Sequence, residues 1–133
     1  MNRIEARKNA MRLIYEWQMG GDGGDETVQG LLKVQPEENE YAIMVDLAGE
    51  VCAKAPELDE VISRYAKGWT VERLNKVDLA ILRIGVCELQ RKKESASVVI
   101  NEAVEMAKEF SSDKAGAFVN GILGNYARDL AKA

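Results

Sequence analysis

The chain has 133 residues, enough for one domain with its own core, and a net charge of -4 with a pI near 5.0. It has no histidine, which is the usual general base and the commonest metal ligand. Its two cysteines, Cys52 and Cys87, lie in separate apolar helical settings, so they make no zinc site and are expected to be reduced core thiols rather than a disulfide. We therefore expect no metal, no cofactor and no enzyme activity, with an Asp/Glu-based enzyme as the remaining alternative.

Charge is distributed unevenly along the chain. Residues 19–63 carry a net charge of -9, whereas residues 64–93 carry +5. Such asymmetry matters more to a polyanion than the total charge does. No apolar run is long enough to cross a membrane, and the N-terminus is polar from Asn2 onward, so we expect no signal peptide and a cytoplasmic protein.

The first predicted helix covers residues 3–19 and ends at two glycines. The apolar stripe of this helix gives way to basic residues toward the N-terminus, because Arg7 and Arg3 lie seven and eleven residues before Ile14 and thus close to the same face. These arginines could extend over the edge of the core with their charges in water, or they could be offered to a ligand. Spacing alone does not decide between the two interpretations.

The next segment, residues 19–26, is rich in glycine but is not a phosphate-binding loop, because no strand precedes it and no Gly-Lys-Ser/Thr closes it. Helical patterns then follow at residues 26–34, 36–55 and 56–67. The helix at 36–55 is expected to place an apolar set inward, Val45 included. A turn of helix is expected to begin at Thr70 as N-cap.

Residues 76–89, KVDLAILRIGVCEL, are apolar around nearly the whole helical circumference. Such a helix is buried, so we predict that the others pack around it. Its charges at Asp78, Arg83 and Glu88 are five residues apart and share no face, so each needs solvent or a partner. For Arg83 we predict a pair with Glu102.

Two further helices are predicted, at about 97–110 and, capped by Ser112, at 113–130. Glycine is unfavourable inside a helix, so Gly116, Gly121 and Gly124 in the last one suggest close helix approach. No segment alternates with period two. The pattern predicts a single all-α domain, residues 1–133, with about seven helices and no sheet.

Five motifs occur in the order and spacing of the bacterial transcription antitermination NusB family, and this resemblance covers nearly the whole chain. They are LIYEWQ (13–18), LDEVISRY with GWTVERL (58–74), VDLAILRIGVCEL (77–89), VINEAVEMAKEF (99–110) and FVNGIL (118–123). The resemblance implies an all-α bundle that binds boxA RNA of ribosomal operons as a single strand. It also implies binding together with NusE, a small-subunit ribosomal protein, in the transcription elongation complex.

The resemblance also implies site residues. RNA contacts fall on the N-terminal arm, on a first-helix tyrosine and on the phenylalanine of FVNG; Lys114, one turn before that phenylalanine, is added because no basic residue directly precedes the motif. These residues are Arg3, Arg7, Lys8, Tyr15, Lys114 and Phe118. Asp78, which opens the central helix, matches the residue that faces NusE.

Two alternatives remain open. The chain could be a helical protein-binding module without RNA activity, or a stand-alone relative of the accessory domain of rRNA cytosine methyltransferases. The second is disfavoured because the chain as given carries no catalytic domain. The sequence leaves open whether the free protein forms a homodimer.

Overall fold

The computed structural model describes residues 3–21 and 39–133, and every regular element in them is a helix. The all-α prediction is confirmed. The contacts divide the chain into two compact units, Met1–Ala53 and Lys54–Ala133, each of which is described by itself. The helix expected at residues 26–34 lies outside the described residues, and the expectation of a single domain over 1–133 stays a prediction.

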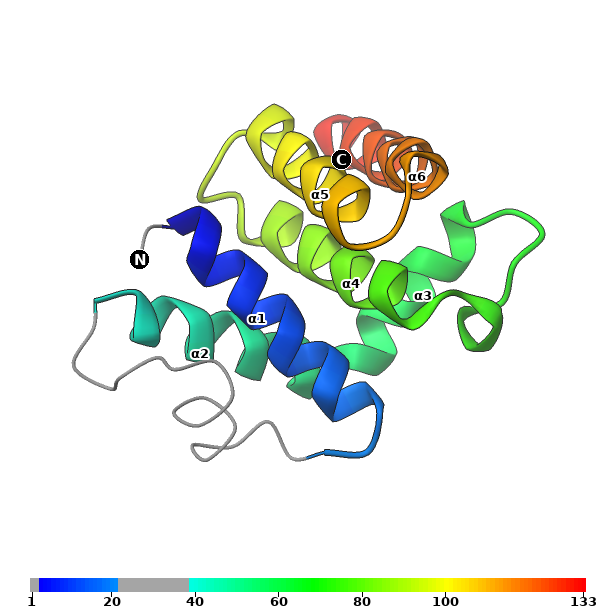
Figure 1. Cartoon of the computed structure of the whole chain (residues 1–133). Helices are drawn as coiled ribbons and strands as arrows, with labels where there is room; N and C mark the ends of the chain where they lie inside the picture. The colour runs from blue at the N-terminus through cyan, green and yellow to red at the C-terminus, as the bar shows by residue number, and fades with distance from the viewer. Residues whose placement is uncertain (1–2, 22–38) are drawn as a thin grey trace. The chain divides into compact units, whose positions relative to one another are not determined.

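The first unit contains α1 (Arg3–Gln18) and α2 (Asn39–Ala53), which pack against each other (Figure 1). Both helices bury apolar residues at helical spacing, such as Ala10 and Ile14 in α1 and Met44 and Val51 in α2. The expectation that Val45 points inward is wrong, since it is 40% exposed. It lies off the stripe that residues 44, 47, 48 and 51 form.

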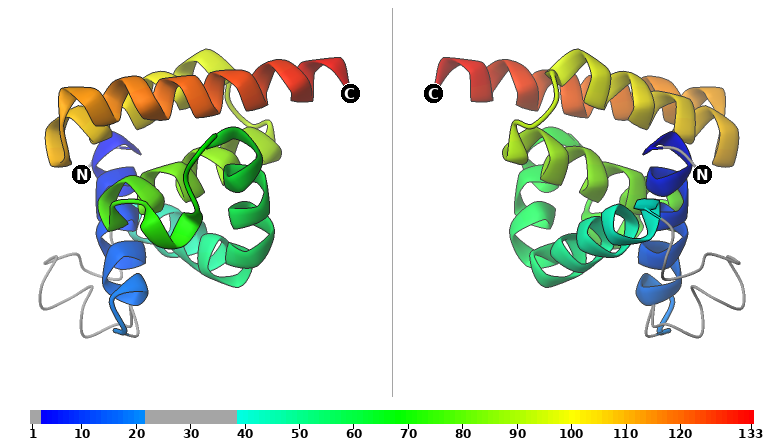
Figure 2. Two further views of the ribbon diagram at one scale, coloured as in Figure 1. Left: turned by 90° about the vertical axis from the view of Figure 1, so that its right-hand side faces the viewer. Right: turned by 90° about the vertical axis from the view of Figure 1, so that its left-hand side faces the viewer.

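The second unit contains α3 (Ala55–Tyr65), the short 3-10 helix η2 (Val71–Arg73), α4 (Lys76–Arg91), α5 (Ala96–Phe110) and α6 (Asp113–Lys132). The helices α5 and α6 form a hairpin that packs on α4 (Figures 1 and 2). The remaining helix, α3, contacts both α4 and α6. No helix within the described ranges is long and apolar enough to cross a membrane.

The central position of α4 is confirmed. Ten of its 16 residues are buried, including a continuous run from Leu79 to Cys87. Its N-terminus is capped by Asn75, whose Oδ1 accepts hydrogen bonds from the backbone N–H groups of Val77 at 2.8 Å and Asp78 at 3.2 Å. The helix thus begins at a fixed point, and Asp78 lies in its first turn.

Arg83 is 7% exposed, and its ion-pair partner is Asp59 of α3. The prediction of a pair with Glu102 is therefore wrong. Arg83 Nε lies 2.8 Å from Asp59 Oδ1, and Nη2 lies 2.7 Å from Oδ2. The two parallel hydrogen bonds satisfy a charge that is costly to bury alone and fix α3 against α4.

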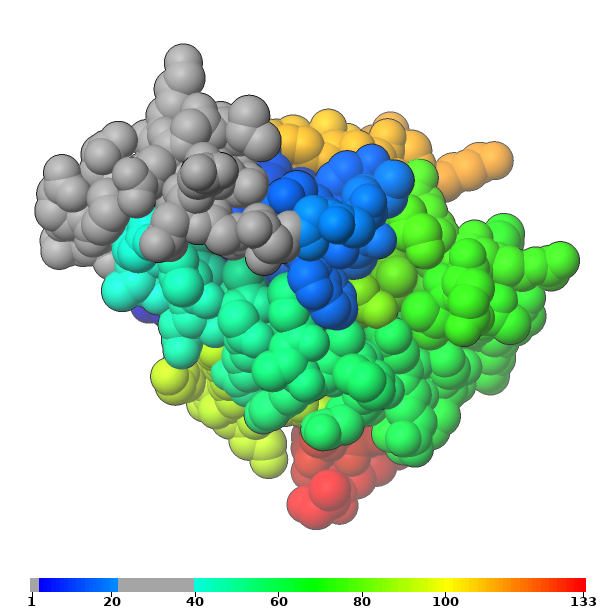
Figure 3. Space-filling model, turned by 90° about the horizontal axis from the view of Figure 1, so that it is seen from below, coloured from blue at the N-terminus to red at the C-terminus, as the bar shows by residue number. Residues whose placement is uncertain are grey.

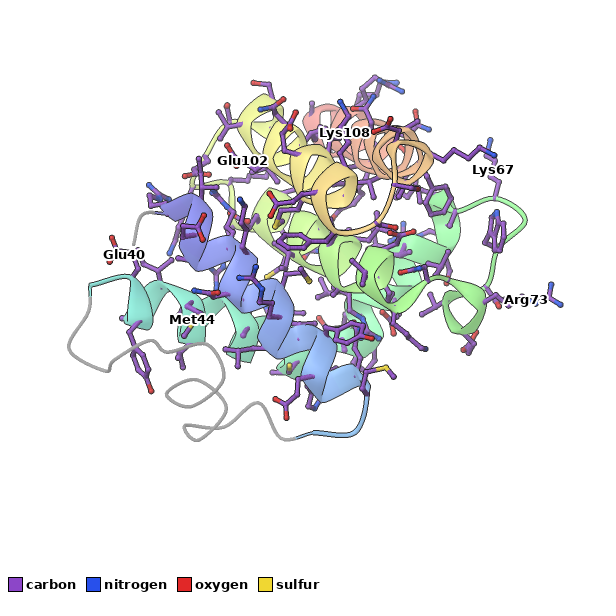
Figure 4. All side chains as sticks on the ribbon, viewed as in Figure 1. Glu40, Met44, Lys67, Arg73, Glu102 and Lys108 are labelled. Carbon is purple, nitrogen blue, oxygen red and sulfur yellow. The ribbon has the colours of Figure 1, made fainter. Side chains whose placement is uncertain are left out.

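Glycines allow close packing at two places in this unit. A Cβ built on Gly85 of α4 would lie 2.5 Å from Leu123 Cδ1 of α6, and one built on Gly116 would lie 2.9 Å from Lys108 Cγ of α5. Lys108 is labelled on α5 in Figure 4. The predicted close approach is therefore confirmed for Gly116, but Gly121 has no atom within 4 Å of a built Cβ.

Candidate nucleic-acid interface

Four of the six predicted RNA-binding residues lie on α1. Arg3 is exposed, Tyr15 is 36% exposed, and Lys8 is half-buried with an ion pair to Glu5 at 3.5 Å. Lys8 and Tyr15 are seven residues apart and share a helical face with Arg12, which lies between them. The sequence-based prediction did not include Arg12, although its spacing of four from Lys8 could have identified it.

Arg7 lies differently from the other three. It is 6% exposed and belongs to the buried face of α1 with Ala6 and Ala10. Of the two interpretations of this stripe, the structure favours packing over the core for Arg7 and leaves Arg3 in solvent. Arg3 is therefore better placed than Arg7 to meet a phosphate.

The other two predicted RNA-binding residues, Lys114 and Phe118, line a pocket in the second unit. Asp78, the predicted partner-binding residue, lines the same pocket, which has a volume of about 210 Å³. Its complete lining is Trp69, Leu74, Asn75, Asp78, Ser112, Lys114, Ala115 and Phe118. Residues that the resemblance assigns to RNA and to protein are therefore brought together at one place.

The starts of two helices form part of this pocket. Asn75 caps α4, and Ser112 caps α6 by accepting a hydrogen bond from the backbone N–H of Ala115 at 3.0 Å. The predicted capping role of Ser112 is confirmed. Helix N-termini carry partial positive charge, so both helix starts favour negative groups at the pocket.

Asp78 is the half-buried acidic group of the pocket. Burial raises the pKa of its carboxyl, while a hydrogen bond from Ser111 acts in the opposite direction and lowers that pKa. Its Oδ1 is buried and has no hydrogen-bond partner among the residues that the structure describes. A carboxylate oxygen that is closed off from water without a hydrogen-bond partner carries an uncompensated desolvation cost.

Trp69 is the aromatic residue of this pocket that the site prediction missed. It follows Gly68, which has a left-handed φ of 83°, and its backbone N–H donates to Ala66 O at 2.9 Å. The connection between α3 and α4, green in Figure 3, lies at the molecular surface, and Trp69 within it is 53% exposed. The sequence did contain a signal for this residue, because a tryptophan that follows a glycine and belongs to no helical pattern of apolar residues is a candidate for exposure.

Basic side chains surround this connection. Lys67 and Arg73 are exposed and extend away from the helices in Figure 4, and Lys76 is also exposed. Aromatic rings for stacking and basic groups for phosphates are what single-stranded RNA requires. Within the described part of the chain, no group of three or more His, Cys, Asp or Glu residues could hold a metal ion.

Comparison with known proteins identifies the family of the chain. The model of the NusB family matches residues 4–128. The transcription antitermination protein NusB of Finegoldia magna is 39% identical over 127 residues, which is 94% of this chain and 93% of the relative. The same protein of Acetivibrio thermocellus is 38% identical and covers 93% of this chain and 87% of its own length.

Solved structures give the same result. The structure of the antitermination factors NusB and NusE in complex with dsRNA contains a chain with a TM-score of 0.84 and 27% identity, covering 97% of this chain and 99% of that one. The crystal structure of a plectonemic RNA supercoil contains a chain with a TM-score of 0.90 and 28% identity, covering 100% and 99%. Fold, motifs and length thus agree, and the chain belongs to the NusB family.

Proposed function

We propose that this protein is a transcription antitermination factor that binds boxA RNA of ribosomal operons together with NusE. The observation that carries the proposal is family membership over nearly the whole chain, because the matched relatives are antitermination proteins and one solved relative binds NusE and RNA. In this role the pair joins the elongating RNA polymerase and suppresses premature termination. The role is non-enzymatic and cytoplasmic.

The proposed RNA-binding residues are Arg3, Arg7, Lys8, Tyr15, Lys114 and Phe118, within a single RNA-binding domain of residues 1–133. Support comes from the exposure of Arg3, Tyr15 and Lys114 and from the pocket that Lys114 and Phe118 share. Arg7 is buried, so its proposed contribution is to hold the arm rather than to meet a phosphate directly.

The proposed partner-binding residue is Asp78. Asp78 is half-buried and lines the pocket, so its negative charge can act on a basic group of NusE. Charge reversal by Asp78→Lys should therefore cost more free energy in NusE binding than it costs in the stability of the fold, which a thermal melt reports. Unchanged NusE affinity beside a lowered melting temperature would leave Asp78 as a helix-end charge only.

Gel filtration of the protein mixed with NusE and boxA RNA tests the proposal as a whole. We expect the three components to elute as one complex. A protein-binding module without RNA activity would elute with NusE and leave the RNA behind. The elution of the protein alone shows whether the free protein forms a homodimer, which the sequence leaves open.

A further inference from the structure

The pocket at the starts of α4 and α6 has two aromatic side chains in its lining, Trp69 and Phe118. Phe118 is half-buried, whereas Trp69 is 53% exposed. We infer that this pocket receives one unpaired nucleobase of the bound RNA, which stacks on the indole of Trp69 while its phosphate contacts Lys114. The inference rests on the proposed RNA binding and adds to it a base-binding pocket and a residue, Trp69.

Charges in the pocket orient the nucleotide. Lys114 is exposed and lies one helical turn before Phe118 on α6, so it can meet a phosphate at the mouth. Asp78 is half-buried in the same lining, and its negative charge disfavours a phosphate inside. A neutral base can enter where a phosphate is disfavoured, because it carries no charge for Asp78 to repel.

The surrounding charge favours the binding of RNA near this pocket. The segment from Ala66 to Lys76 carries three basic residues, Lys67, Arg73 and Lys76, against one acidic residue, Glu72. A polyanion is attracted by these charges and by Lys114 as well. The two helix N-termini at the pocket act in the same direction.

The position of Trp69 is held by its own segment. The Trp69 N–H donates to Ala66 O at 2.9 Å, and the N–H groups of Arg73 and Leu74 donate to Thr70 O at 3.0 Å and Val71 O at 3.2 Å. Leu74 is 6% exposed and anchors the far end of the segment. The backbone that carries the indole is thus formed in the free protein, so base stacking needs to order only the side chain.

Tryptophan fluorescence gives a direct test, because the chain has two tryptophans, Trp17 and Trp69. In a Trp17→Phe variant the remaining indole is Trp69, and titration with boxA RNA in the presence of NusE should quench its emission. The matched control is Trp69→Phe, which keeps Trp17 of α1 as its single indole and should be quenched far less. Equal quenching of both variants, or none in Trp17→Phe while RNA binds, overturns the inference.

Affinity measurements locate the base. Trp69→Ala should weaken RNA binding by about 5- to 150-fold, the range for loss of one stacked base, and Trp69→Phe should recover most of it. A series of boxA RNAs, each with a single abasic site at a different position, should reveal one position where the wild type loses affinity and Trp69→Ala does not. Additive losses at every position would show that Trp69 contacts no base.

The binding of NusE alone separates the remaining outcomes. We expect the NusE affinity of Trp69→Ala to equal that of the wild type. If that affinity falls while RNA affinity is unchanged, the pocket holds a protein side chain and the inference is wrong, although the proposed function stands. If the wild type binds no boxA RNA with or without NusE, the proposed function and the inference both fail.

Discussion

The guanidinium of Arg83 on α4 and the carboxylate of Asp59 on α3 form two parallel hydrogen bonds, at 2.8 and 2.7 Å. The side chain of Arg83 is 9% exposed and that of Asp59 is 25% exposed. The pair therefore lies at the edge of the core, with the arginine on the inner side. Removal of Asp59 therefore has a different consequence from removal of Arg83.

Asp59→Ala should destabilise the protein more than Arg83→Met does. The first variant removes both of these hydrogen bonds from a buried guanidinium, at a cost near the lower end of about 3–5 kcal/mol for breaking a buried pair. The second leaves a carboxylate that water can reach and keeps an apolar side chain in the core. Urea unfolding of both variants checks the order, and equal stability of Asp59→Ala and the parent would show that the pair contributes nothing.

Gly85→Ala should destabilise the second unit despite the higher helix propensity of alanine. Its added Cβ would lie 2.5 Å from Cδ1 of Leu123, which is fully buried and cannot move without disturbing the core. Overpacking costs about 1–3 kcal/mol, which exceeds the propensity gain of about 1 kcal/mol. Gly121→Ala is the matched control on α6, where nothing lies within 4 Å, and thermal melts should show it to be slightly stabilised.

Stability should depend on pH through Asp78, whose pKa burial raises above its ordinary value of 3.8. Because the folded state holds this proton more tightly than the unfolded state, the ionised carboxylate destabilises the fold at neutral pH, and this cost is relieved as the pH falls from the raised pKa toward 3.8. Asp78→Asn should thus be more stable than the parent at pH 7, by a margin that narrows through this window.

Unfolding of the two proteins at pH 7 and across the acidic range measures that margin. A less stable Asp78→Asn at pH 7 would contradict the expectation. It would mean that the attraction of this carboxylate to the positive end of α4, typically about 0.3–1 kcal/mol, outweighs its burial.

Alanine substitutions at Arg3 and Arg7 should have separate effects, the first on RNA binding and the second on stability. Arg3→Ala is expected to leave the melting temperature unchanged and to reduce the slope of log affinity against log salt by about 0.7, the value for one phosphate contact on a single strand. Arg7→Ala should lower the melting temperature, because its side chain is 6% exposed and packs on the inner face of α1. The opposite assignment, with a salt effect for Arg7 and none for Arg3, would place the phosphate contact at Arg7.

Features set by local sequence were predictable. The apolar circumference of residues 76–89 predicted the buried helix α4, and Ser112 was identified as the cap of α6 because side-chain capping acts over three residues. The partner of Arg83 was not predictable in the same way. It depends on how α3 packs against α4, and a helical wheel of either helix contains no such information.

The candidate site also combines residues that could be predicted from the sequence with an arrangement that depends on packing. The resemblance supplied Phe118 and Asp78 one by one, and Lys114 was added from its position one turn before Phe118. Their shared pocket follows from the meeting of two helix starts that are distant in sequence. Trp69 was not assigned to the site because its exposure depends on the backbone turn at Gly68. The sequence of α1 left two interpretations of its basic stripe, and only burial separated Arg7 from Arg3.

The central claim is sequence-specific RNA binding with NusE, and a fluorescence anisotropy titration measures it most directly. Labelled boxA RNA and a permuted strand of the same composition are titrated with the protein, with and without NusE, at one fixed salt concentration. The account predicts that the protein–NusE pair binds boxA RNA more tightly than either protein alone and more tightly than the permuted strand, and that Lys114→Ala with Phe118→Ala weakens this binding. Equal affinity for both strands, or no gain in affinity from NusE, would contradict it.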